Sequence, residues 1–210
     1  GDDAKDINHI FLTHSHADHI TDLPFIIETF FENREIPLTI YALEETIEVL
    51  KKHSFNDVIW PDFTKIKLLR KDAFSLILKP IKLDEIIKIH NYSIKAIKAN
   101  HISGACGFVI KKNHQGFVIS GDTHINPHIW EEINNDEEIR SLIIECSYPD
   151  KLQELAKLTK HLTPELIANE LEKLTRKNLS VFYYHLKPSY NKELLKDIKS
   201  INYLLTMVKY

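Results

Sequence analysis

The sequence predicts a single α/β domain, and three of its features lead to that prediction. Short apolar runs typical of buried strands alternate along the chain with longer segments whose apolar residues recur at helical spacing. No internal repeat, low-complexity tract or glycine- and serine-rich linker divides the 210 residues. A chain of this length, of which 43% is hydrophobic, can bury a sizeable core without disulfides. We therefore expect residues 1–210 to form one domain of mixed strands and helices.

Strands are predicted where β-branched or alternating apolar residues run for four or more positions. The first, at 7–12, leads directly into a polar, histidine-rich loop at 13–19. Two later runs, 107–112 and 116–120, are separated by three polar residues and predict a hairpin. In chain order the predicted strands are 7–12, 38–41, 66–69, 74–78, 86–90, 92–99, 107–112, 116–120, 142–146 and 181–184.

Helices are predicted between these strands, where apolar residues recur every three or four positions. The segment 22–33 shows this repeat, and 43–53 has one apolar and one charged face. Thr163, Pro164 and Glu165 are typical of a helix start, with a capping hydroxyl, a proline in the first turn and an acid near the positive end of the dipole. In chain order the predicted helices are 22–33, 43–53, 126–135, 150–160, 164–174 and 191–199.

The charge balance makes a polynucleotide partner unexpected. The chain has 27 basic and 30 acidic residues and a net charge of −3, whereas nucleic-acid-binding domains usually carry a basic surplus. A small anionic substrate is compatible with this balance, because a metal ion can supply positive charge locally. The two cysteines, Cys106 and Cys146, lie in apolar runs, and we expect buried free thiols rather than a disulfide.

The sequence contains no secretory signal and no apolar run long enough to cross a membrane. We therefore expect a cytoplasmic protein without membrane contact. A periplasmic location stays open as the alternative, because the chain begins at Gly1 only a few residues before its main motif and looks shortened at this end.

The strongest chemical signal is the loop Thr13-His14-Ser15-His16-Ala17-Asp18-His19, which follows the first predicted strand. On a tight loop, His14 and His16 can converge on one metal ion. Asp18 and His19 can then face a second ion beside it. Imidazoles and carboxylates in this combination suit zinc, manganese or iron better than calcium. A solvated loop with chance histidines is the weaker interpretation, since this spacing is far more specific than a lone histidine.

Three further residues follow predicted strands and are candidates to complete the metal site. His101 comes after 92–99, Asp122 follows 116–120, and His185 comes directly after 181–184. A carboxylate such as Asp122 can bridge two cations that lie about 3.5–4 Å apart. The remaining histidines are interpreted as surface or structural residues, with His124 as the one nearest to the pattern: His9, His53, His90, His114, His124 and His128.

The order of these residues resembles that of the metallo-β-lactamase superfamily. It consists of His-x-His-x-Asp-His, then a lone histidine, an aspartate after glycine, and a late histidine. The resemblance implies two divalent metal ions, Zn²⁺ foremost and Mn²⁺ or Fe²⁺ as alternatives. It implies the following ligands: His14, His16 and His101 at the first ion, Asp18, His19 and His185 at the second, and Asp122 between them. His16 stands where flavodiiron proteins have glutamate, and Asp122 where zinc β-lactamases have cysteine. Both differences favour the dinuclear hydrolases and phosphodiesterases.

The second half of the chain narrows this resemblance. The segments 144–149 (IECSYP), 161–164 (HLTP) and 185–190 (HLKPSY) resemble those of class II 3′,5′-cyclic-nucleotide phosphodiesterases, as does 55–61 (FNDVIWP). The implied activity is hydrolysis of cAMP or cGMP to nucleoside 5′-monophosphates. The implied catalytic residues are Asp18, also a ligand, His161 as the proton donor to the leaving 3′-oxygen, and Glu145 as the carboxylate that orients His161.

The same resemblance implies an α/β fold of the metallo-β-lactamase type, a four-layer αβ/βα sandwich with the site at the sheet edges. Family members begin with several strands before the histidine-rich loop, so we expect this chain to lack its N-terminal strands. An open sheet edge then favours a homodimer.

Two alternative functions belong to different classes of protein. One is a tRNA 3′-processing endonuclease or another hydrolase of this fold, and the net charge of −3 argues against an RNA substrate. The other is a binding protein without catalysis, against which the intact ligand set argues.

Overall fold

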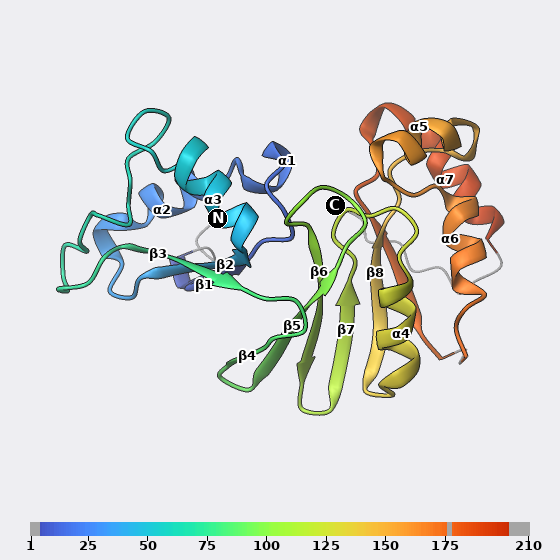
Figure 1. Ribbon diagram of the computed structural model, residues 1–210, viewed down its shortest axis with the longest axis horizontal. Coiled ribbons are helices and arrows are strands. Elements are labelled where there is room, and N and C mark those ends of the chain that lie inside the picture. The colour runs from blue at the N-terminus through green and yellow to red at the C-terminus, as the bar shows by residue number, and fades with distance from the viewer. Residues whose placement is uncertain (1–4, 176–177, 202–210) are drawn as a thin grey trace. The chain divides into compact units, whose positions relative to one another are not determined.

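The computed structural model describes residues 5–175 and 178–201, and the chain divides into two compact units, which end at Lys82 and begin at Leu83. Each unit contains one β-sheet and a hydrophobic core of its own. In Figure 1 the first unit is coloured blue to teal and the second green to red. That both units form one functional domain is a prediction from the sequence.

The first unit is built on a three-stranded parallel sheet in the order β1-β2-β3. Its strands are β1 (His9–Phe11), β2 (Leu38–Leu43) and β3 (Leu76–Ile81). Every residue of the central strand β2 is buried. This explains why its sequence is almost continuously apolar instead of alternating.

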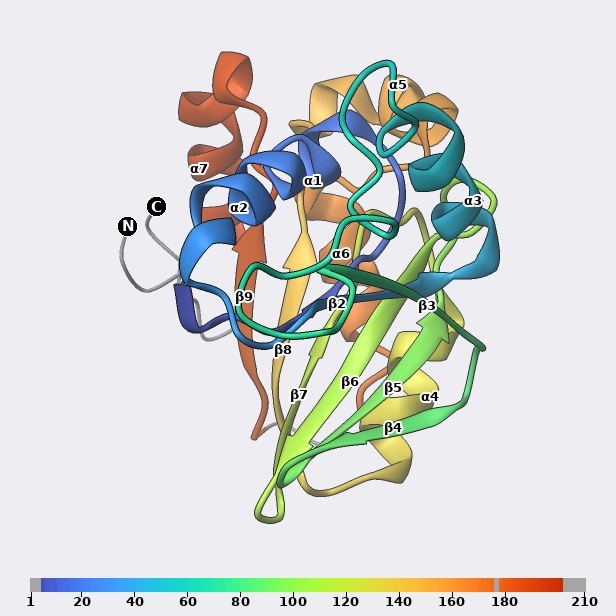
Figure 2. The ribbon, with the colours of Figure 1, turned by 90° about the vertical axis from the view of Figure 1, so that its left-hand side faces the viewer.

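Helices connect the parallel strands of the first unit, as Figure 2 shows. They are α1 (Ala17–Ile20), α2 (Leu23–Thr29), a 3₁₀ turn (Phe31–Asn33) and α3 (Glu44–His53). Ile27 of α2 and Leu50 of α3 are fully buried in one core with Ile40 of β2. This core fixes the end of β1, from which the histidine-rich loop leaves.

The second unit is built on a six-stranded mixed sheet in the order β4-β5-β6-β7-β8-β9. Neighbours from β4 to β7 are antiparallel, and β7, β8 and β9 are parallel. The strands are β4 (Ile86–Ile89), β5 (Tyr92–Lys98), β6 (Cys106–Lys112), β7 (Gln115–Ile119), β8 (Ile139–Glu145) and β9 (Ser180–Tyr184). It follows that β5, β7, β8 and β9 all run in one direction.

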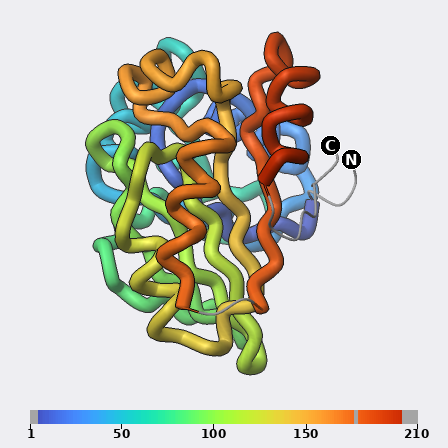
Figure 3. The backbone as a smooth tube through the Cα atoms, turned by 90° about the vertical axis from the view of Figure 1, so that its right-hand side faces the viewer, coloured from blue at the N-terminus to red at the C-terminus, as the bar shows by residue number. Residues whose placement is uncertain are grey.

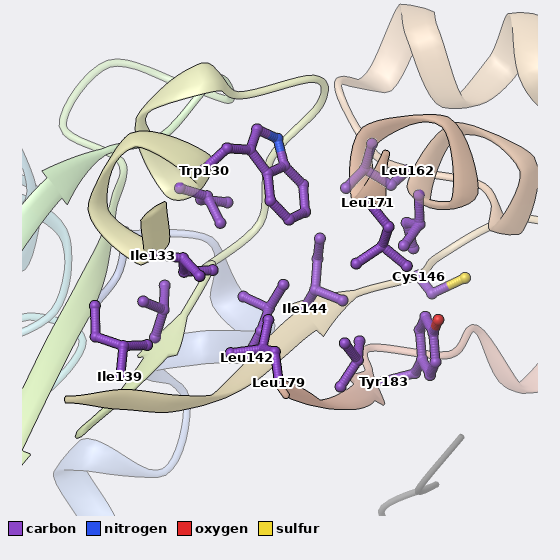
Figure 4. Close-up of a cluster of buried hydrophobic side chains, with 14 of the residues drawn as sticks. Trp130, Ile133, Ile139, Leu142, Ile144, Cys146, Leu162, Leu171, Leu179 and Tyr183 are labelled. Carbon is purple, nitrogen blue, oxygen red and sulfur yellow. The ribbon is translucent and has the colours of Figure 1, made fainter. Parts of the chain in front are cut away.

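Helices cover one face of this sheet, because parallel neighbours require crossover connections (Figure 1 and Figure 3). They are α4 (Pro127–Asn135), α5 (Gln153–Thr159), α6 (Pro164–Leu171) and α7 (Asn191–Ser200), with 3₁₀ turns at Asp150–Leu152 and Pro188–Tyr190. Trp130 of α4 and Leu171 of α6 pack with Leu142, Ile144 and Tyr183 of the sheet (Figure 4). Within the described residues, none of the helices has the length and apolar character needed to span a membrane.

The common direction of β5, β7, β8 and β9 places their C-terminal ends at one edge of the sheet. His101, Asp122 and His185 follow three of these ends, and Glu145 is the last residue of the fourth, β8. The hydrophobic core beneath the strands therefore positions four of the predicted site residues.

Two details differ from the sequence-based expectations. The predicted strand at 66–69 is wrong, because this stretch forms only an isolated bridge between Lys67 and Phe74. Leu69 is 65% exposed, so the run lacks the continuous buried face that would hold it against a neighbouring strand. The predicted loop at 13–19 ends early, since Ala17 already begins α1.

The hairpin between β6 and β7 is present, with a tighter turn than expected. Lys112 pairs directly with Gln115, which leaves a two-residue connection instead of three residues. Asn113 and His114 have φ angles of 50° and 61°. Two consecutive positive φ values define the type I′ turn that matches the twist of paired strands.

Candidate metal centre

The histidine-rich loop of the first unit brings three imidazoles together. His14 Nε2 lies 3.0 Å from His16 Nδ1, and the His14 and His19 ring centroids are 4.2 Å apart. The Thr13 hydroxyl lies 3.1 Å from the other ring nitrogen of His14. When the Thr13 hydroxyl accepts a hydrogen bond from the His14 Nδ1–H, the lone pair of His14 Nε2 faces His16. Two ring nitrogens this close can bind the same cation.

Asp18 and His19 lie on α1, whose N-cap residue is His16. Asp18 Oδ2 is 3.8 Å from His19 Nε2. The Asp18 side chain is the more exposed of the two, at 61% against 18% for His19. The helix therefore presents a carboxylate and an imidazole together, as the loop motif predicts for a second ion.

In the second unit, His101 is fixed on both sides by Lys160. The His101 Nδ1–H donates to the Lys160 carbonyl at 3.1 Å, and the Lys160 amine donates to the His101 carbonyl at 2.6 Å. Lys160 has a φ of 57° and ends α5. Because Nδ1 holds the proton, Nε2 of His101 carries the lone pair that a metal ligand needs.

Asp122 and His185 face each other at the ends of β7 and β9. Asp122 follows Gly121, whose φ of 63° turns the chain sharply, and its side chain is buried. His185 Nε2 lies 3.5 Å from Asp122 Oδ2. Ligand atoms of Asp122, His161 and His185 all lie within 4.8 Å of one another. This carboxylate and two imidazoles form a group that can hold a divalent ion.

Glu145 is fully buried and accepts hydrogen bonds on both carboxylate oxygens. Oε1 accepts from His161 Nδ1 at 2.7 Å and from the Thr123 amide at 3.0 Å. Oε2 accepts from the Ser147 hydroxyl at 2.8 Å and from the Leu162 amide at 3.3 Å. Four donors compensate the cost of burying one negative charge. They also fix the His161 ring with its Nδ1 proton toward Glu145.

His185 is oriented through Ser147. The Ser147 hydroxyl oxygen lies 2.8 Å from His185 Nδ1 and 3.2 Å from His161 Nδ1. His185 itself has a φ of 59°, an unusual conformation for a residue other than glycine. The His161 and His185 rings stack with centroids 5.3 Å apart.

The donor set of each unit fits divalent metal ions. Imidazole nitrogens and carboxylate oxygens are the ligands that zinc, manganese and iron accept. The second nitrogen of His101 and of His185 is held by a carbonyl or a hydroxyl, as it is in metal-ligating histidines generally. The seven predicted ligands are divided between the units, with four in the first and three in the second.

Three residues of this network were not assigned a role from the sequence. Ser147 lies two positions after Glu145, so both side chains leave an extended segment on the same side, and this signal was available. Lys160 gave no signal, because its contacts with His101, through its carbonyl and its Nζ amine, join segments far apart in the sequence. His124, interpreted as structural, donates from Nδ1 to the His161 carbonyl at 2.7 Å and so supports the His161 backbone.

Three of the other histidines make contacts away from this group. His9 lies 3.3 Å from the Tyr41 hydroxyl, His114 lies 2.7 Å from Glu138, and His128 lies 3.3 Å from Glu131.

The two cysteines, Cys106 and Cys146, are buried free thiols, as expected.

A fold of this kind, with groups able to hold a metal ion, defines a class of α/β proteins, and the comparisons with known proteins identify the family. The sequence profile described as "Beta-lactamase superfamily domain" matches residues 1–183 and runs through both units. The chain belongs to this superfamily. The metallo-β-lactamase fold protein YhfI from Bacillus subtilis has the same fold, with a TM-score of 0.76 over 98% of this chain and 77% of YhfI, at 17% identity. The predicted fold class is confirmed.

The curated relatives include cyclic-nucleotide phosphodiesterases. A probable 3′,5′-cyclic-nucleotide phosphodiesterase from Yersinia pestis is 27% identical over 89% of this chain and 59% of its own length. The 3′,5′-cyclic-nucleotide phosphodiesterase 1 of Saccharomyces cerevisiae is 27% identical over 97% of this chain and 56% of its own. The crystal structure of unliganded yeast PDE1 superimposes with a TM-score of 0.75 over 93% of this chain and 62% of that chain, at 25% identity. The chain thus spans just over half the length of these two curated relatives.

Proposed function

We propose that this chain is a metal-dependent phosphodiesterase that hydrolyses 3′,5′-cyclic nucleotides, cAMP or cGMP, to nucleoside 5′-monophosphates. The observation that carries the proposal is the buried Glu145–His161 pair next to Asp122 and His185. A carboxylate-held imidazole beside a metal-binding group is suited to phosphodiester cleavage, which needs both charge compensation and a proton donor. The similarity to curated cyclic-nucleotide phosphodiesterases supports this substrate class.

The proposed cofactors are two divalent metal ions, with Zn²⁺ preferred and Mn²⁺ or Fe²⁺ as alternatives. His14, His16 and His101 would hold one ion. Asp18, His19 and His185 would hold the other, with Asp122 between them. When bound, such ions lower the pKa of water and offset the negative charge of a phosphodiester.

In this proposal His161 supplies a proton to the leaving 3′-oxygen. Its Nδ1–H is held by Glu145, so the proton available to a substrate is on Nε2. The Glu145 carboxylate stabilises the protonated imidazole and prevents the ring from turning, as a buried acid does in other catalytic pairs. The Asp18 side chain is 61% exposed, and Asp18 is the proposed contact to the incoming nucleophile.

A second candidate is cleavage of a tRNA precursor. A ribonuclease Z from Methanosarcina mazei is 30% identical over 51% of this chain and 32% of its own length. The net charge of −3 disfavours it, because RNA binding normally relies on basic residues that contact phosphates. A homodimer and a cytoplasmic location are further proposals that rest on the sequence alone.

Hydrolysis by purified, metal-loaded protein tests the proposal. Cyclic AMP and cyclic GMP are compared with bis-p-nitrophenyl phosphate and a tRNA precursor, with His16→Ala as the negative control. His53→Ala, an exposed histidine at the end of α3, serves as the matched control that retains activity. Conversion of cyclic nucleotides to 5′-monophosphates, lost only in His16→Ala, is the expected result. Cleavage of the tRNA precursor alone would replace the proposed substrate with the second candidate.

A further inference from the structure

Ser147 occupies a position that the proposed catalytic scheme does not use. Its side chain is completely buried, and its hydroxyl contacts three charged or ionisable groups at once. These are Glu145 Oε2 at 2.8 Å, His185 Nδ1 at 2.8 Å and His161 Nδ1 at 3.2 Å. A fully buried hydroxyl with this set of neighbours does more than fill space.

Counting protons fixes the direction of these hydrogen bonds. A hydroxyl has one proton to donate and two lone pairs that accept, whereas an ionised carboxylate only accepts. Glu145 also accepts from two backbone amides, so donors surround both of its oxygens, as suits a group that only accepts. The Ser147 proton therefore points to Glu145, and the lone pairs of Ser147 accept from the imidazoles. His185 must then carry its proton on Nδ1, which leaves Nε2 facing Asp122.

The backbone around Ser147 holds it rigidly in this position. The Cys146 amide donates to the Tyr184 carbonyl at 3.0 Å, and the Ser147 amide donates to the Leu162 carbonyl at 3.1 Å. The chain after β8 is thus hydrogen-bonded on one side to the end of β9 and on the other to the residue after His161. Ser147 lies between the two segments that carry His185 and His161.

We propose that Ser147 is a positioning residue that links the Glu145 carboxylate to His185. One buried carboxylate then orients two histidines, His161 directly and His185 through the Ser147 hydroxyl. The inference rests on the proposed function in one respect, namely that His185 is a metal ligand. Loss of the hydroxyl frees the His185 ring to rotate and to exchange its tautomers. This lowers the affinity of the site for the ion that His185 binds.

Ser147→Ala tests the link, and Ser75→Ala is the matched control. Ser75, in the first unit, is also completely buried, and its one hydroxyl proton is shared between the Phe63 and Ile66 carbonyls at 3.0 and 2.9 Å. Both variants lose a buried hydroxyl, so both lose stability. In a titration against a competing chelator, Ser147→Ala is expected to bind one of two zinc ions about 10–100-fold more weakly, as outer-shell substitutions do. Ser75→Ala is expected to bind both ions as the unchanged protein does.

A second measurement keeps the test independent of metal loading and of activity. The ¹⁵N chemical shifts of the His185 ring in metal-free protein report which nitrogen is protonated. The Nδ1–H form is expected in the unchanged chain and in Ser75→Ala, and a mixture of tautomers in Ser147→Ala. Wild-type zinc affinities together with an unchanged His185 spectrum in Ser147→Ala would overturn the role of Ser147. Failure of the loaded protein to cleave cyclic nucleotides would overturn the proposed function instead, because neither readout depends on turnover.

Discussion

His161 is held from two directions, by Glu145 at the ring and by His124 at the backbone carbonyl. This double support is typical of a residue whose ring must stay in one orientation during a reaction. It also places a ring nitrogen of His161 within 4.8 Å of ligand atoms of Asp122 and His185. The position of His161 suits a proton donor and also a metal ligand. One substitution distinguishes these two roles.

His161→Ala is expected to lower kcat by roughly 10²–10⁴-fold, the contribution of a positioned acid or base, while both metal ions stay bound. Steady-state kinetics and the metal content of the purified variant are measured together. Loss of one ion would show that His161 is a ligand. Unchanged turnover would remove His161 from the reaction altogether.

The buried thiols lead to a prediction about pH. Burial raises the pKa of Cys106 from 9.0 to about 12 and also raises the pKa of Cys146. A folded-state pKa above the unfolded value means that the neutral thiol is favoured in the native state. The associated stability is complete below the unfolded pKa and is lost as the pH rises toward the folded one.

The free energy of unfolding is therefore expected to fall as the pH rises from about 9 toward about 12, in part because of Cys106. Cys106→Ala should show a smaller decrease over this range in denaturant titrations. An equal decrease in both proteins would assign the effect to other groups. Native protein is also expected to resist alkylation at about pH 8, where the buried thiols are neutral.

At the scale of elements, the β6–β7 hairpin places Asp122 and is sensitive at Gly107. A Cβ added to Gly107 would lie 2.6 Å from the carbonyl oxygens of Ile119 and Ser120. These are backbone atoms, so the strand itself would have to shift. Ser120 leads directly to Gly121 and Asp122, and such a shift would carry the carboxylate with it.

Gly107→Ala is expected to destabilise the protein by roughly 1–3 kcal/mol and to weaken metal binding as well. Gly116→Ala, in the paired strand at the far end of the hairpin, is the control. Its added Cβ would lie 2.7 Å from Cγ of Lys111, a side-chain atom that can move, and 3.1 Å from the nearest backbone atom, the Ile110 carbonyl oxygen. Thermal unfolding measures the stability of both variants, and zinc titration measures their metal affinity. Equal metal affinity in Gly107→Ala and the unchanged protein would contradict the link to Asp122.

Most elements were predictable from the sequence, because burial imposes a period on the residues that pack in a core. The strands 92–99 and 142–146 and the helix at 43–53 correspond to β5, β8 and α3 with small changes at their ends. The structure of segment 66–69 was not predictable, since apolar composition does not reveal whether a partner strand is adjacent. Strand pairing over a long sequence distance depends on the whole fold.

The candidate site shows the same limit. The types and spacing of His14, His16, Asp18 and His19 mark them as candidate ligands, because a metal needs ligands close together on a short loop. The spacing of two residues places Ser147 on the same side as Glu145, but its contacts with His161 and His185 join distant segments and are visible only in the structure. The sequence thus predicts which side chains carry ligand atoms better than it predicts which hydrogen bonds orient them.

At the scale of the whole molecule, the proposed ligands come from both compact units. Metal that binds the native chain and not the unfolded chain stabilises it by about 2.7 kcal/mol at a free concentration 100-fold above the dissociation constant. Removal of metal by a chelator is therefore expected to lower the melting temperature, and added zinc to restore it. His16→Ala should lose this response and His53→Ala should keep it. If a chelator did not change the melting temperature, the expectation that metal bound at the proposed site stabilises the native chain would be wrong.

The burial of Glu145 has a consequence for how the site opens. The amide hydrogens of Thr123 and Leu162 are bonded to a carboxylate that solvent does not reach. Deuterium can replace them only when the segments carrying Thr123, Glu145 and Leu162 separate. The exchange rates of these two amides therefore measure how often the hydrogen bonds around Glu145 come apart in the native protein. They give this information without substrate, and at two places far apart in the sequence.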